Sequence, residues 1–300
     1  MINVHQLCFD YENKRALDQV SFKLPRQSIT ALVGANGAGK TTLLRCLSAL
    51  EAPTSGQIRI DGLNTQEQPR QCHQKIGYLS DFFGLYEELT VQQCLHHRCL
   101  LYGIDPIQPR IDETVELTGL SSRLHDRAGH LSRGLRQRLA ISQAIIHRPN
   151  LLLLDEPASG LDPEARHELS KLFLLLQSQG MTMLVSSHIL SELEDYCDHI
   201  LMIQDGQMAG QRQITQLEQA QLCLQLTTPC QRLDALLSQH ENISDIHIDG
   251  SQANFSFSGD LQARQQLLQQ LIQEGMPLYS FTEQQLKLQD VYSQLRGEQS

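Results

Sequence analysis

The feature that most restricts the fold is a glycine-rich segment between an apolar run and a helical pattern. It matches G-x-x-x-x-G-K-T and consists of Gly34, Ala35, Asn36, Gly37, Ala38, Gly39, Lys40 and Thr41. Residues 28–33 before it predict a strand, and the leucines at 43, 44, 47 and 50 after it share one face of a predicted helix. Backbone N–H groups of such a loop point at phosphate oxygens, and the helix N-terminus adds positive potential. The segment therefore predicts a phosphate-binding loop in an α/β fold; a glycine-rich turn that binds nothing is the alternative.

Two acidic residues follow a second apolar run. Residues 151–154 are four leucines, typical of a strand buried on both faces, and Asp155 and Glu156 come directly after them. Lys40 would reach the β- and γ-phosphates of a nucleotide, while the Thr41 hydroxyl and Asp155 would hold Mg²⁺. Glu156 would accept a proton from the water that attacks the γ-phosphate. An ordinary acidic strand end is the alternative, which the phosphate loop disfavours.

Strand and helix patterns alternate over residues 1–210. Helical patterns dominate residues 85–146, and a further helix is predicted from Pro163 to about Gln179. Strands are predicted over residues 4–9, 20–24, 57–60, 182–185 and 200–203. This alternation predicts a mostly parallel sheet covered by helices.

The pattern changes after about Gly210. Strands are predicted over residues 222–226, 243–248, 253–257 and 278–281, and helices over 232–239, 262–274 and 284–295. Up to the last strand, the order β-α-β-β-α-β is typical of a ferredoxin-like fold. We therefore predict two domains, residues 1–210 and a small α+β domain over residues 211–300.

Charge and apolar pattern restrict the partners. The formal net charge of −10 disfavours nucleic acid, because phosphate contacts need clustered Lys and Arg. No apolar run approaches the length of a membrane span, and the N-terminus lacks the pattern of a secretory signal. The eight cysteines contain no C-x-x-C pair and predict free thiols in a reducing compartment. We expect a chain that stays in the cytoplasm unless a partner holds it at a membrane.

Further motifs make residues 1–210 resemble the nucleotide-binding domain of ATP-binding-cassette (ABC) proteins. Residues 131–138 resemble the family's signature motif, and residues 155–157 its Walker B motif with the catalytic glutamate. Residues 159–162 resemble its D-loop, and His188 resembles its switch histidine. Tyr11 stands where the family places an aromatic ring against adenine, although core packing is an alternative for this residue. The resemblance implies an ABC cassette with a mostly parallel core sheet, antiparallel N-terminal strands and a helical subdomain at about residues 85–146.

The resemblance also implies a mechanism. ATP and Mg²⁺ are the implied cofactors, and the implied partner is a second cassette, either another copy in a homodimer or a sister chain. Cassettes of the family pair head to tail, so Ser132 and Gly134 of one would cap the γ-phosphate held by residues 34–41 and Thr42 of the other. The D-loop residue Asp162 is implied to lie at the same nucleotide. His188 is implied to hydrogen-bond the γ-phosphate, with a purely structural histidine as the alternative.

Two positions depart from the family's commonest pattern. Asp81 stands where the family usually has a Gln that contacts Mg²⁺ and the attacking water. An aspartate can still bind Mg²⁺, and ABC-2-type exporters, one branch of the family, often carry an acidic residue there. Arg133 replaces the first glycine of the signature pair, whereas Gly134 is kept.

Two stretches resemble one branch of the family, the cassettes of ABC-2-type exporters. They are residues 76–102 and residues 288–292 near the end of the chain. The implied partners are integral membrane permease subunits, which would hold the chain at the cytoplasmic face of the membrane and dock on residues 85–146. Within that region Cys94, His97 and Cys99 allow either a soft-metal site or, as we favour, free thiols on a docking helix.

Other interpretations stay open at this point. A soluble cassette ATPase of translation or DNA repair is disfavoured by the single cassette, the lack of sustained heptads and the acidic charge. A non-catalytic, ATP-gated regulatory module is motivated by Asp81. The acidic run at residues 192–198, which includes Glu192, is interpreted as a solvated helix face.

Overall fold

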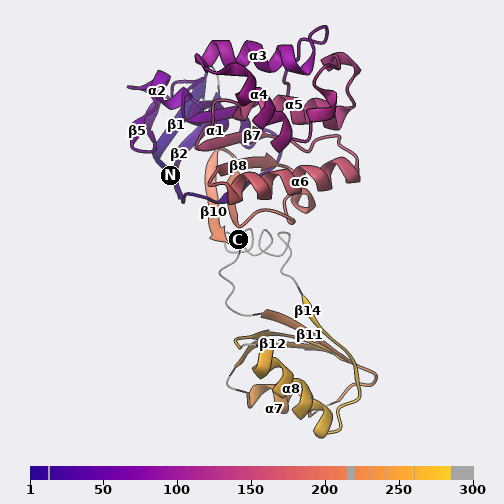
Figure 1. Cartoon of the computed structure of the whole chain (residues 1–300). Helices are drawn as coiled ribbons and strands as arrows, with labels where there is room; N and C mark the ends of the chain where they lie inside the picture. Colours follow the sequence, from indigo (N-terminus) through magenta and orange to yellow (C-terminus); the bar gives the residue numbers. More distant parts are fainter. Residues whose placement is uncertain (13, 215–219, 231, 241, 260, 285–300) are drawn as a thin grey trace. The chain divides into compact units, whose positions relative to one another are not determined.

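The computed structural model describes all residues except 13, 215–219, 231, 241, 260 and 285–300 (Figure 1). The described residues form two units, one over Met1–Ile214 and one within residues 215–291, and each is described by itself. The helix predicted over residues 284–295 and the stretch at residues 288–292 lie outside the described residues, apart from Gln284 at the end of a strand.

A six-stranded sheet forms the core of the first unit, in the order β10-β9-β3-β8-β7-β6. All neighbours are parallel except β10, which is antiparallel to β9. The strands are β3 (Ile29–Val33), β6 (Ile76–Leu79), β7 (Leu151–Asp155), β8 (Thr182–Ser187), β9 (His199–Gln204) and β10 (Gln207–Gln213). Every residue of β3, β7 and β8 is buried, as expected for central parallel strands. The predicted mostly parallel sheet is confirmed; the sequence pattern misses β10, which is only partly buried.

A second, antiparallel sheet contains the N-terminal strands, in the order β2-β1-β4-β5. Its strands are β1 (Ile2–Tyr11), β2 (Lys14–Leu24), β4 (Ser55–Ile60) and β5 (Leu63–Asn64). The apolar side chains of β1, β2 and β4 share one buried cluster with α1 and with residues of β3, β7 and β9. The implied antiparallel N-terminal strands are therefore confirmed.

Helices of the first unit include a separate group of three, α3, α4 and α5 (Figure 1). The helices are α1 (Lys40–Leu47), α2 (Pro69–His73), α3 (Val91–Tyr102), α4 (Ile107–Leu117), α5 (Arg133–Ile145) and α6 (Pro163–Ser178), with short 3-10 helices at Ser121–Arg123, Ala128–His130 and Leu190–Glu192. The group has its own apolar cluster, which contains the buried free thiols of Cys94 and Cys99. Among the described residues no group of three or more His, Cys, Asp or Glu side chains is arranged to hold a metal.

The acidic run at residues 192–198 is not a solvated helix face. Only Leu190–Glu192 forms a short 3-10 helix, and the next element is β9. The side chain of Glu192 is only 4% exposed, and it contacts Arg166 and Ser187. That interpretation of the sequence was therefore wrong for Glu192.

The second unit is a four-stranded antiparallel sheet in the order β12-β13-β11-β14. Its elements are β11 (Ala220–Leu226), α7 (Leu233–Ser238), β12 (Ile243–Asp249), β13 (Gln252–Phe257), α8 (Leu261–Gln273) and β14 (Leu278–Gln284). Apolar side chains of the sheet pack with those of both helices in one cluster. Element order and strand order are those of the predicted ferredoxin-like fold.

His147, which follows α5, occupies a poorly solvated position. Its ring stacks on Tyr102 with 3.9 Å between ring centroids, and Nε2–H donates to the carbonyl oxygen of Ile76 at 3.0 Å. The buried Nδ1 has no hydrogen-bond partner among the described residues. Burial lowers the pKa of His147 to about 4. The folded chain therefore holds this ring neutral.

Folding stability is expected to fall as the pH drops from 6.5 towards 4, because the unfolded chain binds a proton at His147 that the folded chain excludes. The contribution of the neutral His147 ring to the free energy of unfolding is fully present above pH 6.5. About 3 kcal/mol of it is lost between pH 6.5 and pH 4. Urea titrations at pH 7.5 and 5.0 measure the part of this loss that falls above pH 5, about 2 kcal/mol. His147→Gln should show a smaller loss of unfolding free energy between the two pH values, whereas the exposed His125→Gln control should match wild type. An equal loss in His147→Gln and wild type would contradict the assignment.

No helix among the described residues is both long enough and apolar enough to span a bilayer.

Candidate nucleotide-binding and catalytic site

The glycine-rich loop joins β3 to α1, and its shape depends on two glycines. A Cβ on Gly34 would lie 2.3 Å from the carbonyl oxygen of Ile203. Gly39 caps α1 with a φ of 107°, and a Cβ there would lie 2.8 Å from the carbonyl oxygen of Ala16. Larger residues would therefore change the path of the backbone just before the N-terminus of α1.

Lys40 is buried and lines a cavity of about 440 Å³. Its Nζ donates to the carbonyl oxygens of Gly34 and Ala35 at 2.7 and 3.3 Å and lies 3.6 Å from Glu156 Oε1. The predicted residues that line this cavity are Tyr11, Asn36, Gly37, Gly39, Lys40, Thr41, Thr42, Asp81 and Glu156. The remaining loop residues Ala35 and Ala38 belong to the same turn, in which Ala38 N–H donates to Ala35 O at 3.1 Å. An anion in this cavity would meet an ammonium group and the positive end of a helix.

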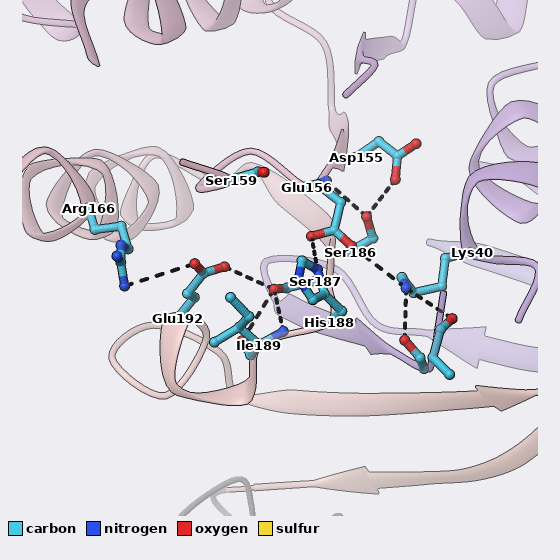
Figure 2. A network of polar contacts seen from close by, with 12 residues as sticks. Lys40, Asp155, Glu156, Ser159, Arg166, Ser186, Ser187, His188, Ile189 and Glu192 are labelled. Atoms are coloured by element: carbon cyan, nitrogen blue, oxygen red, sulfur yellow. Dashed lines mark hydrogen bonds and ion pairs between the residues drawn. The ribbon is translucent and has the colours of Figure 1, made fainter. Parts of the chain in front are cut away.

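Asp155 ends β7 and is 1% exposed. Its Oδ1 accepts a hydrogen bond from Ser186 Oγ at 2.6 Å, and the same hydroxyl accepts Glu156 N–H at 3.0 Å (Figure 2). The buried Oδ2 has no hydrogen-bond partner among the described residues. A free carboxylate oxygen at this depth fits Mg²⁺, which needs only one or two protein carboxylates because it keeps waters and binds substrate phosphates.

Glu156 lies between the phosphate loop and His188 (Figure 2). Its φ of 48° is unusual for a residue other than glycine, and its side chain is 13% exposed. Oε2 lies 2.8 Å from His188 Nδ1, and Oε1 faces Lys40 Nζ. The structure thus brings Lys40, Glu156 and His188 together, in an arrangement that can hold a water against a phosphate and accept its proton.

Asp81 lines the same cavity and follows β6 in the sequence. Partial desolvation, followed by the negative charges of Asp155 and Glu156, raises the pKa of its carboxyl above the usual value. A divalent cation among these carboxylates would remove that repulsion.

Tyr11 lies at the end of β1 and is 48% exposed. Its ring and that of Phe9 form a T-shaped pair with 5.0 Å between ring centroids, and its hydroxyl lies 3.3 Å from Thr42 Oγ1. This position combines packing on Phe9 with exposure to the cavity, so a planar base has access to the ring.

Ser132, Gly134 and Asp162 do not line the cavity at Lys40. Ser132 and Asp162 instead accept backbone N–H groups as N-caps of α5 and α6. A Cβ on Gly134 would lie 3.0 Å from Ala165 Cβ, so the two helix starts are close to each other. Within one chain these three residues therefore lie outside the lining of the cavity that contains Lys40.

Sequence reasoning missed three polar side chains around this site. Ser186 holds Asp155 and the backbone of Glu156. Glu192 contacts Ser187 next to His188, and Arg166 contacts Glu192. Ser186 follows directly from the predicted strand over residues 182–185, which was the available signal. Arg166 and Glu192 are 26 residues apart in sequence, and no local pattern relates them.

Comparison with known proteins agrees with the fold. Residues 17–159 match the family model described as ABC transporter. The chain is 33% identical over 296 residues to the uncharacterized ABC transporter ATP-binding protein YxlF of Bacillus subtilis, covering 97% of this chain and 98% of YxlF. It is 32% identical over 293 residues to the bacitracin transport ATP-binding protein BcrA of Bacillus licheniformis, covering 96% and 94%. A solved ATP-binding subunit of an ABC transporter has a TM-score of 0.65 and 30% identity, covering 73% of this chain and 92% of that one.

The fold and the site therefore define a P-loop ATPase of the cassette type. The chain belongs to the family of ABC transporter ATP-binding proteins. It is an ABC-type ATPase that binds nucleotide, and the two relatives above are ATP-binding proteins of an ABC transporter and of bacitracin transport by name.

Proposed function

We propose that this chain is the ATP-hydrolysing subunit of a multisubunit ABC-2-type exporter. The observation that carries the catalytic part is the carboxylate of Glu156, placed between His188 and Lys40 at the cavity of the phosphate loop. ATP would bind with its phosphates on residues 34–42 and its adenine against Tyr11. Lys40 would contact the β- and γ-phosphates, which it can reach by leaving the carbonyl oxygens of its own loop.

Mg²⁺ would be held by Thr41, Asp155 and Asp81. The free Oδ2 of Asp155 and the raised pKa of Asp81 support this set. When bound, Mg²⁺ would neutralise charge on the phosphates. Glu156 would accept a proton from the attacking water, and His188 would hydrogen-bond the γ-phosphate.

Asp81→Ala is expected to raise the Mg²⁺ concentration for half-maximal ATP hydrolysis by about tenfold, because one carboxylate ligand is removed. Titration of Mg²⁺ at saturating ATP measures the change. Asp81→Asn keeps one ligand oxygen and should give an intermediate shift. Glu88→Ala removes an exposed carboxylate nearby in the sequence and should leave the midpoint unchanged. A wild-type midpoint in Asp81→Ala would exclude Asp81 as a ligand.

Two copies would pair head to tail as a homodimer. Ser132, Gly134 and Asp162 do not line the Lys40 cavity of their own chain. This supports the pairing, because these residues then remain available to a nucleotide on the other copy. Ser132 stands at the N-terminus of α5, where backbone N–H groups favour a phosphate. ATP would then join the copies, and hydrolysis would release them.

Permease subunits would hold this dimer at the cytoplasmic face of the membrane. The resemblance to BcrA, a bacitracin transport protein by name, supports the exporter branch. A second cavity of about 780 Å³ lies beside Asp81 and includes Phe82, Phe83 and Leu85. Phe82 is 92% exposed there, which suits an apolar contact with another subunit.

The chain purified by an affinity tag from native membranes is expected to retain an integral membrane protein with several membrane-spanning helices. Phe82→Ser should lose most of that protein, because the exposed ring is its proposed contact. Tyr279→Ser removes another exposed ring, in the second unit, and should retain the protein. Mass spectrometry of the eluate identifies the retained membrane protein and compares its amount among the variants. If wild type retains no membrane protein in mild detergent, the transporter assignment fails.

A further inference from the structure

Glu192 is a buried carboxylate that lies between two segments of the site (Figure 2). Its side chain is only 4% exposed. A carboxylate at this depth needs charged or hydrogen-bonding partners to offset the loss of water. Glu192 has such a partner on each carboxylate oxygen, Arg166 on one and Ser187 on the other.

Arg166 connects Glu192 to the segment that follows Glu156. Its Nη1 lies 3.9 Å from Glu192 Oε1. Its Nε and Nη2 both donate to the carbonyl oxygen of Leu161, at 3.3 and 3.2 Å. Leu161 belongs to residues 159–162, so one guanidinium group contacts both this segment and Glu192.

Ser187 connects Glu192 to the backbone around His188. Its Oγ donates to Glu192 Oε2 at 3.0 Å and accepts Ile189 N–H at 3.0 Å. These bonds restrain the residues on both sides of His188. The ring of His188 in turn lies 2.8 Å from Glu156.

We infer that Glu192 is a positioning residue for ATP hydrolysis, which joins residues 159–162 to His188 through Arg166 and Ser187. The inference rests on the proposed role of His188 at the γ-phosphate. Residues 159–162 end in Asp162, which the proposed dimer places near the nucleotide of the second copy. A shift of this segment on pairing is therefore transmitted to the backbone of His188. Glu192 makes the alignment of the switch histidine depend on the presence of the second copy.

Glu192→Gln tests the link in the full-length chain. The amide keeps the size of the side chain and an acceptor for Ser187, but it removes the charge that holds Arg166. We expect kcat to fall by about tenfold, since small displacements of a catalytic group have effects of this order or more. The Kd for ATP should change less than twofold, because the phosphate loop does not contact Glu192. Asp195→Asn removes an exposed carboxylate of the same run and should leave both quantities unchanged.

A second variant, His188→Ala, distinguishes a positioning role of Glu192 from a structural role of Glu192. In single-turnover assays with enzyme in excess, adding Glu192→Gln to His188→Ala should slow hydrolysis no further, because the effect passes through the missing ring. The inference is overturned by an unchanged kcat in Glu192→Gln, by a further tenfold loss in the double variant, or by a loss of ATP affinity that accounts for the loss of rate. If His188→Ala alone hydrolyses ATP at the wild-type rate, the proposed role of His188 fails, and the inference fails with it.

Discussion

Lys40→Ala is expected to lower the affinity for ATP by at least about 100-fold. The buried ammonium group would donate to the β- and γ-phosphates, and each charge-assisted hydrogen bond contributes about 1.5 kcal/mol or more. Two such bonds correspond to about two orders of magnitude in Kd. Isothermal titration calorimetry with ATP and Mg²⁺ measures the loss.

Lys171→Ala provides the matched control for this change. Lys171 is exposed on α6 and forms a surface ion pair with Glu168 at 2.9 Å. Such pairs contribute little, so the variant should bind ATP like wild type. Near-normal binding by Lys40→Ala, with thermal unfolding unchanged, would refute the assignment of residues 34–41 as the phosphate loop.

Glu156→Gln is expected to lower the rate of ATP hydrolysis by about 10²- to 10⁴-fold, the range that a positioned general base contributes. ATP should still bind, because the amide has the shape of the carboxylate and lacks its negative charge near the γ-phosphate. Phosphate release at saturating ATP measures the rate, and calorimetry measures the binding. The two quantities together separate loss of catalysis from loss of the site.

Glu164→Gln, at an exposed position in the first turn of α6, should hydrolyse ATP at the wild-type rate. This control excludes a general effect of removing one negative charge. Wild-type turnover that is no higher than turnover in Glu156→Gln would remove Glu156 from the proposed mechanism. It would also favour the non-catalytic, ATP-gated module suggested by Asp81.

The sequence predicted the elements whose pattern is local. Four consecutive leucines before Asp155 indicate a buried strand. The glycine-rich segment before α1 indicates the phosphate loop, because phosphate binding needs glycines, Lys and Thr at this spacing. The ferredoxin-like second unit also followed from the order of short strands and helices. By contrast, β10 is only partly buried and carries little apolar signal, so it was missed.

The contacts around His188 were beyond prediction for a different physical reason. Glu156 contacts His188 and has a positive φ, and nothing in the motif shows either feature. Glu192 is charged and stands in an acidic run, so periodicity places it at the surface. Only in the folded chain do Arg166 and Ser187 contact Glu192, and these contacts offset the free-energy cost of burying its charge.

The central claim is that ATP joins two copies of this chain, and the mass of Glu156→Gln in solution tests it most directly. Light scattering after size exclusion should give the 33.9 kDa of one chain without nucleotide and twice that mass with ATP and Mg²⁺. Addition of Lys40→Ala to the same variant should abolish the doubling. A mass that stays at 33.9 kDa while calorimetry shows ATP bound would contradict the account.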